Sequence, residues 1–125
     1  MSKKKIMVVD DEESLLQLVA AILGNEGYEV IQAANGKECL DKLKKETPDL
    51  ILLDVMMPGM TGREVLENIR KNPKTKNIKV ILLTVIRYVE LGKLGKDMFK
   101  SLKVIDYITK PFENDDLIKR VKKVL

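Results

Sequence analysis

The sequence contains no histidine, no tryptophan and only one cysteine, Cys39, and these absences remove several classes of chemistry. Without histidine there is no Ser-His or Cys-His catalysis, no histidine metal site and no phosphohistidine within the chain. A single cysteine cannot form an internal disulfide, and Cys39 falls at an apolar position of a helical pattern, which indicates core packing. Chemistry must therefore come from carboxylates, hydroxyls, lysines and backbone groups.

Long apolar runs and aromatic residues are also scarce. No run approaches the ~20 apolar residues of a membrane-spanning helix, and Met1–Lys5 leads straight into a short strand rather than a signal-peptide core. We therefore expect a cytoplasmic protein without a membrane partner. The net charge is +4, but the lysines are scattered along helical stretches beside only three tyrosines and two phenylalanines, which disfavours nucleic-acid binding.

The length of 125 residues predicts one domain, residues 1–125, and the order of patterns predicts an α/β fold. Five strand patterns alternate with five helical patterns, which indicates a doubly wound five-stranded parallel sheet. The runs that begin at Ile6, Leu50 and Val80 are the most apolar, so these strands should be central. The expected strands are 6–9, 29–33, 50–54, 80–83 and 104–108.

The helical patterns differ in clarity. Thr61 and Glu64 fit a capping box that starts a helix at the end of a long loop. The fourth pattern, roughly 87–100, is irregular because Gly92 and Gly95 interrupt it. The first pattern places five aliphatic side chains on one face: Leu15, Leu18, Val19, Ile22 and Leu23.

Polar groups follow four of the predicted strands. The apolar run Leu50–Leu53 stops on Asp54, shortly before Pro58-Gly59, which cannot extend a central strand. The carboxyl ends of parallel strands lie along one edge of the sheet, so polar groups at those ends should converge on one crevice. The groups at the other three strand ends are Asp10-Asp11, Thr84 and Lys110.

Three carboxylates in one crevice repel one another unless a cation offsets their charge. Oxygen ligands without histidine or cysteine point to Mg²⁺ or Mn²⁺. Lys110 adds a positive charge and Thr84 a hydroxyl donor, both suited to a phosphoryl group. Together these groups describe phosphoryl transfer, with Asp54 as the natural nucleophile because it stands alone on a central strand.

Each residue also has a purely structural interpretation. Asp10 with Glu13 fits a capping box of the first helix as well as it fits a metal site. Thr84 fits a strand-end hydroxyl bonded to the backbone, Lys110 a surface lysine and Tyr107 a half-exposed aromatic on an edge strand. These interpretations are reasonable one by one, but jointly they do not explain four polar groups at one sheet edge.

The chain resembles the receiver domains of two-component response regulators over essentially its whole length. The motifs that carry the resemblance are Val8-Val9-Asp10-Asp11, Leu52 to Gly62, Leu82-Leu83-Thr84 and Asp106 to Phe112. The resemblance implies a flavodoxin-like, CheY-like (βα)5 fold with strand order 2-1-3-4-5.

The resemblance also implies roles for individual residues. Asp54 would accept a phosphoryl group from a partner histidine kinase or histidine phosphotransfer protein. Asp11 and Asp54 would bind Mg²⁺ directly, Asp10 mainly through water, and the backbone carbonyl of Met56 would complete the protein ligands. Thr84 and Lys110 would contact the phosphoryl group, Tyr107 would switch when Thr84 moves, and the Lys110-Pro111 bond would be cis.

The function implied is that of a phosphoprotein in a two-component phosphorelay that signals to a downstream protein by contact. Such a module is not an enzyme, apart from self-catalysed phosphotransfer to Asp54 and hydrolysis from it. The alternative is a Mg²⁺-dependent phosphohydrolase with an aspartyl-phosphate intermediate, although Met56 stands where such enzymes commonly place a second acid. A flavodoxin-like nucleotide binder is disfavoured because Asp10-Asp11 would repel an anion.

The sequence departs from the family pattern in three respects. Val85 follows Thr84 where the family usually has Ala or Ser, and Val85, Met56 and Ile86 offer no side chain to orient an attacking water. We therefore hypothesise a long-lived phosphoaspartate, which a measured lifetime of seconds would rule out. Residues 85–109 form a longer span than most receivers have, and residues 101–103 replace the usual Gly-Ala before the last strand.

Overall fold

The computed structural model describes residues 3–57, 59–85, 92, 96 and 100–125. Within them strands and helices alternate along the chain, as the sequence pattern predicts. The elements are β1 (Lys5–Val9), α1 (Glu13–Asn25), β2 (Glu29–Ala33), α2 (Gly36–Leu43), β3 (Leu50–Asp54), α3 (Gly62–Lys71), β4 (Lys79–Thr84), β5 (Asp106–Thr109) and α6 (Asn114–Val124). The predicted fourth helical segment, 87–100, lies largely outside the described residues.

The five strands form one parallel sheet in the order β2-β1-β3-β4-β5, which confirms the expected order. The three strands predicted to be central are central. Every residue of β3 is buried, because neighbouring strands flank it on both edges and helices cover both faces. A continuous aliphatic run is stable only in such a position.

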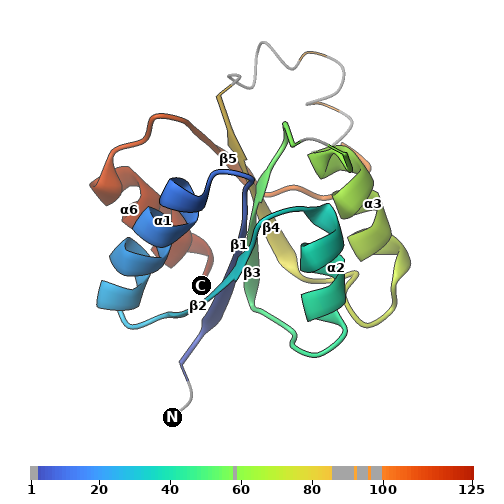
Figure 1. Ribbon diagram of the computed structural model, residues 1–125, viewed down its shortest axis with the longest axis horizontal. Coiled ribbons are helices and arrows are strands. Elements are labelled where there is room, and N and C mark those ends of the chain that lie inside the picture. The colour runs from blue at the N-terminus through green and yellow to red at the C-terminus, as the bar shows by residue number, and fades with distance from the viewer. Residues whose placement is uncertain (1–2, 58, 86–91, 93–95, 97–99) are drawn as a thin grey trace.

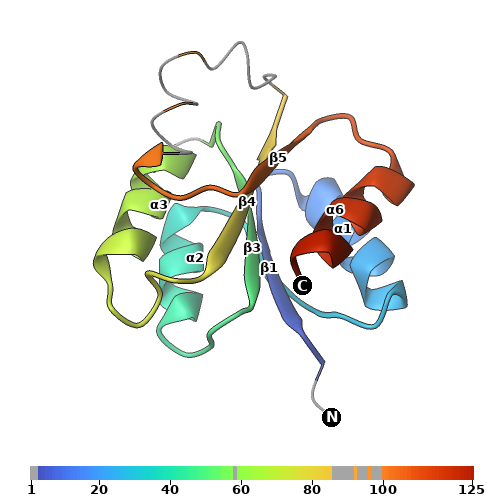
Figure 2. The same ribbon diagram turned by 180° about the vertical axis from the view of Figure 1, so that it is seen from behind.

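Helices α1 and α6 cover one face of the sheet, and α2 and α3 cover the other (Figures 1 and 2). Alternate β3 side chains serve the two cores: Leu50 and Leu52 pack under α1 and α6, while Ile51 and Leu53 pack under α2 and α3. Burying each such side chain contributes about 1.5–3 kcal/mol. The two cores therefore hold β3 rigidly from both sides.

The helix starts on the α2–α3 face follow local sequence signals. The predicted capping box is confirmed, since Thr61 Oγ1 accepts the Glu64 backbone N–H at 3.2 Å and Glu64 reaches back to the Thr61 N–H at 3.3 Å. Asn35 caps α2 in the same way through the Glu38 N–H. These caps satisfy backbone donors that the first helical turn leaves unpaired.

The start and the inner face of α1 differ from the prediction. Leu18 was expected to point inward but is 46% exposed, and Leu16 takes its place beside Val19 and Leu23. The aliphatic residues of α1 cover a wider part of its surface than the sheet and α6 bury, so Leu18 at the margin stays exposed to solvent. The capping box of Asp10 and Glu13 is wrong: the N-cap is Glu12, and no side chain caps it.

The segment that leads into β5 contains a left-handed residue. Lys103 has a φ of 56°, a conformation that favours glycine. Arg70 of α3 holds this segment by donating to the carbonyl oxygens of Leu102 at 2.8 Å and Ile78 at 2.7 Å.

No helix in the described part of the chain is long and apolar enough to cross a membrane.

Candidate functional site

The strand register brings the polar strand ends to one edge of the sheet. Val9 of β1 lies opposite Leu53 of β3, so Asp10 and Asp54 follow at the same level. Asp54 in turn lies opposite Leu83 of β4, which precedes Thr84. Residues far apart in the sequence therefore meet because parallel pairing aligns the strand ends.

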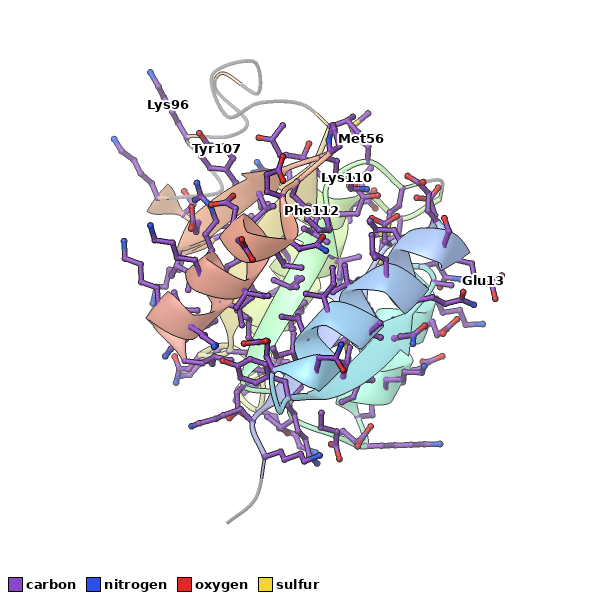
Figure 3. The ribbon with its side chains drawn as sticks, turned by 90° about the vertical axis from the view of Figure 1, so that its left-hand side faces the viewer. Glu13, Met56, Lys96, Tyr107, Lys110 and Phe112 are labelled. Atoms are coloured by element: carbon purple, nitrogen blue, oxygen red, sulfur yellow. The ribbon has the colours of Figure 1, made fainter. Side chains whose placement is uncertain are left out.

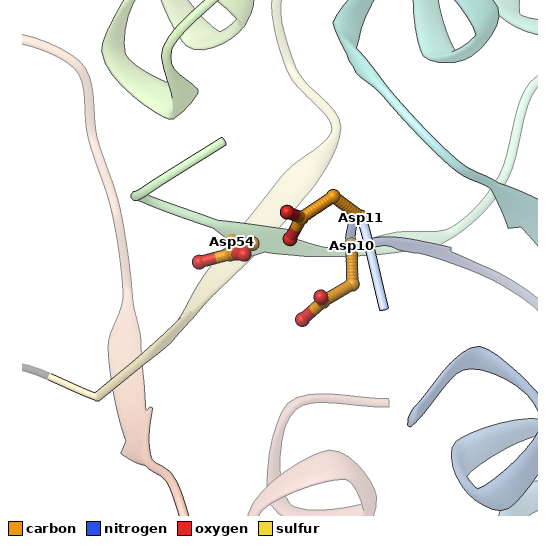
Figure 4. A group of neighbouring side chains, drawn as sticks. All are labelled: Asp10, Asp11 and Asp54. Carbon is orange, nitrogen blue, oxygen red and sulfur yellow. The ribbon is translucent and has the colours of Figure 1, made fainter. Parts of the chain in front are cut away.

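Three carboxylates gather at this edge. Asp10, Asp11 and Asp54 each place an oxygen within 4.8 Å of the other two (Figure 4). Asp10 and Asp54 are buried at 0% and 3% exposure, while Asp11 is exposed. The cluster thus has a buried floor and one side open to solvent.

Lys110 supplies the positive charge in this cluster. Its Nζ lies 2.6 Å from Asp10 Oδ2 and 3.6 Å from Asp54 Oδ2, and only 10% of its side chain is exposed. Burial lowers the pKa of Lys110, but the hydrogen bond to Asp10 and the attraction of Asp54 raise it above its ordinary value. Lys110 is therefore a largely buried cation and not the surface lysine of the structural interpretation.

Asp54 has an unusual acidity for an aspartate. Burial raises its pKa to about 6, and the nearby Asp10 and Asp11 act in the same direction. The Met56 backbone N–H, which donates to Asp54 Oδ1 at 3.0 Å, and the charge of Lys110 oppose the rise. Asp54 is thus held in one orientation by the backbone two residues later, and it is mostly ionised at neutral pH.

Thr84 and Lys110 are coupled through the backbone. Thr84 is fully buried at the end of β4, and its carbonyl oxygen accepts the Lys110 N–H at 2.7 Å. The Lys110-Pro111 peptide bond is cis.

Tyr107 lies on β5 opposite Leu82, is half-buried, and packs against the core under α2 and α3. Figure 3 shows Met56, Tyr107 and Lys110 at the same end of the molecule.

The donor set is compatible with a divalent metal. Three carboxylates without nitrogen or sulfur ligands suit Mg²⁺ or Mn²⁺, and the exposed side at Asp11 leaves room for water or substrate oxygens. Asp10 also accepts the Glu12 N–H at 3.0 Å, which orients it without making it a helix cap. The structure thus contradicts the capping interpretation of Asp10 and places its carboxylate beside Lys110.

Two residues of this region escaped the sequence analysis. Glu12 places Oε1 3.9 Å from Lys110 Nζ, and its position directly after an acidic pair was the available signal. Gly62 is the first residue of α3, and a Cβ added to it would lie 2.4 Å from the carbonyl oxygen of Asp54, eight positions earlier in the chain. A glycine after a capping threonine gives no sign of that close approach in the sequence.

Comparison with known proteins gives one consistent family. A family model described as the response regulator receiver domain matches residues 6–122. Sporulation initiation phosphotransferase F of Bacillus subtilis (strain 168) is 40% identical over 125 residues, 100% of this chain and 96% of that protein. The alkaline phosphatase synthesis transcriptional regulatory protein PhoP of the same bacterium is 42% identical over 98% of this chain, which spans only 48% of PhoP.

Solved structures agree. Chemotaxis protein CheY4 of Vibrio cholerae superposes with a TM-score of 0.90 at 34% identity, over 99% of this chain and 100% of that one. Response regulator TrrA of Thermotoga maritima, solved in complex with Mg²⁺-BeF, gives a TM-score of 0.82 at 41% identity over 98% of this chain and 99% of that one. At these identities the likeness extends beyond the fold to the sequence.

Proposed function

The chain belongs to the response regulator receiver family of two-component signalling, and we propose that Asp54 accepts a phosphoryl group from a phosphorylated histidine of a partner protein. Receiver domains are signalling domains rather than conventional enzymes. The observation that carries the proposal is the buried Asp54 carboxylate, 3.6 Å from Lys110 and within 4.8 Å of two further carboxylates. That arrangement costs stability and needs a chemical reason.

The transfer balances with the groups present. A carboxylate oxygen of Asp54 forms the new bond to phosphorus as the phosphorus–nitrogen bond of the donor breaks. The electron pair returns to the imidazole nitrogen, which takes a proton from solvent. Because the pKa of Asp54 is about 6, the nucleophile is ionised at neutral pH without a general base.

The neighbours of Asp54 stabilise the transferred group. We assign Lys110 and the Thr84 hydroxyl to the phosphoryl oxygens, since Lys110 Nζ lies 3.6 Å from Asp54 Oδ2 and Thr84 ends β4, the strand paired with β3. Asp10, Asp11, Asp54 and the Met56 backbone carbonyl would hold Mg²⁺, as supported by the donor set and by the Mg²⁺-BeF complex of TrrA. Bound Mg²⁺ neutralises charge on the phosphoryl oxygens.

We further propose that Thr84 and Tyr107 form the conformational switch and that the output is contact with a downstream protein. Both residues lie on the paired strands β4 and β5, so a displacement at Thr84 is transmitted through the strand pairing. Adding Mg²⁺ and beryllofluoride should change tyrosine fluorescence, and Thr84→Ala should abolish most of that change while Asp54→Asn abolishes all of it.

The alternative functions have less support. A phosphohydrolase of the aspartyl-phosphate type commonly carries a second acid where this chain has Met56, whose side chain is 58% exposed. A nucleotide binder would have to place an anion beside Asp10 and Asp11. The single domain over residues 1–125 and the cytoplasmic location stay predictions.

The test is covalent labelling of the intact protein. With Mg²⁺ and acetyl phosphate, mass spectrometry should find one phosphoryl group on the wild type and none on Asp54→Asn or in the presence of EDTA. Asp49→Asn is the matched control, because Asp49 is exposed and lies just before the first residue of the same strand, away from Asp54. Labelling of Asp54→Asn, or no labelling of the wild type, would contradict the proposal.

The lifetime of the phosphoaspartate is a separate hypothesis. Met56 and Val85 are 58% and 61% exposed and surround the site with apolar side chains, whereas Ile86 lies outside the described residues. Met56→Asn adds an amide that can orient water, so it should shorten the lifetime several-fold in a decay measurement. A wild-type lifetime of seconds would refute the hypothesis and leave the phosphoacceptor role intact.

A further inference from the structure

We propose that Gly62 is a positioning residue for the metal and phosphoryl site, because its missing side chain lets α3 press directly on the Asp54–Val55 peptide. A Cβ at Gly62 would lie 2.4 Å from the Asp54 carbonyl oxygen and 2.7 Å from Val55 Cα. Both distances are far below any contact that atoms tolerate. The inference rests on the proposed function of Asp54.

Neither side of this contact is free to yield. On one side, the Asp54–Val55 peptide lies at the carboxyl end of the central strand β3 and is held by β4. Asp54 pairs with Leu83, and the Val55 N–H donates to the Leu83 carbonyl oxygen at 3.2 Å. On the other side, the capping box at Thr61 fixes the first turn of α3, and the buried Val65 and Leu66 fix its face. A Cβ between them must displace one or the other.

The backbone that would move carries the site. The Gly62 N–H donates to the Val55 carbonyl oxygen at 3.1 Å, and the next residue, Met56, donates its N–H to Asp54 Oδ1 at 3.0 Å. Met56 also carries the backbone carbonyl assigned to Mg²⁺. Gly62 therefore sets the position of the Asp54 carboxylate and of the Met56 backbone carbonyl, the two groups that face the metal and phosphoryl site. Its own atoms are not assigned to any ligand.

A second glycine provides the matched control. Gly36 is the first residue of α2, is buried, and follows the side-chain cap Asn35, as Gly62 follows Thr61. A Cβ at Gly36 would also be crowded, with Val65 Cγ2 at 2.6 Å and Met60 Cβ and Sδ at 3.0 Å, but these are side-chain atoms. Gly36→Ala should therefore destabilise the protein and leave the Asp54 backbone in place.

The experiment measures Mg²⁺ affinity, stability and the Met56 amide signal in the wild type, Gly62→Ala and Gly36→Ala. Mg²⁺ titration by calorimetry should show a dissociation constant raised about 10-fold or more for Gly62→Ala, as for the loss of other supporting contacts around metal ligands. Gly36→Ala should keep the wild-type constant despite a lower melting temperature. In the metal-free protein, only Gly62→Ala should shift the Met56 amide resonance.

The outcomes separate two failures. If the wild type neither binds Mg²⁺ nor takes up phosphate, the proposed function is wrong. If the wild type does both and Gly62→Ala matches Gly36→Ala in Mg²⁺ affinity and amide shift, Gly62 has only a structural role and the inference is overturned. A poorly folded Gly62→Ala is measured in trimethylamine N-oxide, which favours the folded state, and failure to fold even there would also overturn it.

Discussion

Two ion pairs of equal length lie in different regions of the molecule. At the carboxyl ends of the strands, Lys110 Nζ is 2.6 Å from Asp10 Oδ2, and the two side chains are 10% and 0% exposed. Toward the other end, where α1 and α6 finish, Lys122 Nζ is 2.6 Å from Glu26 Oε1, and these side chains are 55% and 29% exposed. Only the surroundings distinguish the two pairs.

The comparison shows that distance alone does not measure the importance of an ion pair. Water and salt screen the exposed pair, which gains little over its separated charges. In the buried pair each charge depends on its partner, because water reaches a lone charge there only poorly. The carboxyl edge thus keeps three acids and one cation where they cost stability, which supports the phosphoacceptor site proposed above.

The largest expected effect is the loss of the buried cation. Lys110→Met keeps the apolar stem but removes the one positive neighbour of Asp10 and Asp54 among the described residues. Without divalent metal at pH 8, the free energy of unfolding should fall by about 2–4 kcal/mol in urea titrations. Added Mg²⁺ should restore much of it by replacing the missing charge. An unchanged urea midpoint would show that the buried pair is no more important than the exposed one.

The next effect is the pH dependence of Asp54. Its pKa rises from 3.8 to about 6 on folding, so the folded protein holds this proton more tightly than the unfolded chain. The resulting stability is fully present below about pH 4 and is lost as the pH rises through about 6. Asp54→Asn should therefore raise the free energy of unfolding by about 1–3 kcal/mol at pH 8 in EDTA.

The pH dependence of the stability gain tests whether the gain in Asp54→Asn comes from the charge of Asp54. The stability difference between the wild type and Asp54→Asn should shrink as the pH is lowered from 7 to 4, since the wild-type carboxylate then becomes neutral. Asp49→Asn, which changes an exposed acid just before β3, is measured in parallel as the control. A stability gain that does not depend on pH would assign the effect to packing rather than to charge.

A smaller effect is expected from relieving backbone strain at Lys103, where no buried charge is involved. Lys103 adopts a φ of 56° before β5, far from the acidic cluster. Lys103→Gly removes the steric cost of that conformation, offset by the greater flexibility of glycine in the unfolded chain, for a net gain of about 0.5–1 kcal/mol. The gain should be equal at pH 5 and pH 8. A loss of stability would mean that the lysine side chain contributes more than the strain costs.

The smallest effect belongs to the exposed ion pair. Lys122→Met removes the partner of Glu26 at the same 2.6 Å distance as in the buried pair. Its urea midpoint should stay at the wild-type value within error, in low and in high salt. A loss as large as that of Lys110→Met would remove the distinction between the two regions.

Much of the architecture follows from local sequence signals. The continuous aliphatic runs at Ile6, Leu50 and Val80 predicted the three central strands, because only a strand covered on both faces tolerates such a run. Thr61 and Glu64 predicted the start of α3 because a capping box acts over a single helical turn. Leu18 was misplaced because the periodicity of a helix shows its apolar side but not how much of it the sheet covers.

Local patterns in the sequence are enough to identify the polar groups at the carboxyl ends of the strands, since strand ends and their residues are local properties of the chain. Local patterns do not show that Asp10 faces Lys110 instead of capping α1, that burial raises the pKa of Asp54 to about 6, or that the Asp54 backbone leaves no space for a Cβ at Gly62. These properties depend on distances and burial between segments that are separate in the sequence, and packing sets those distances.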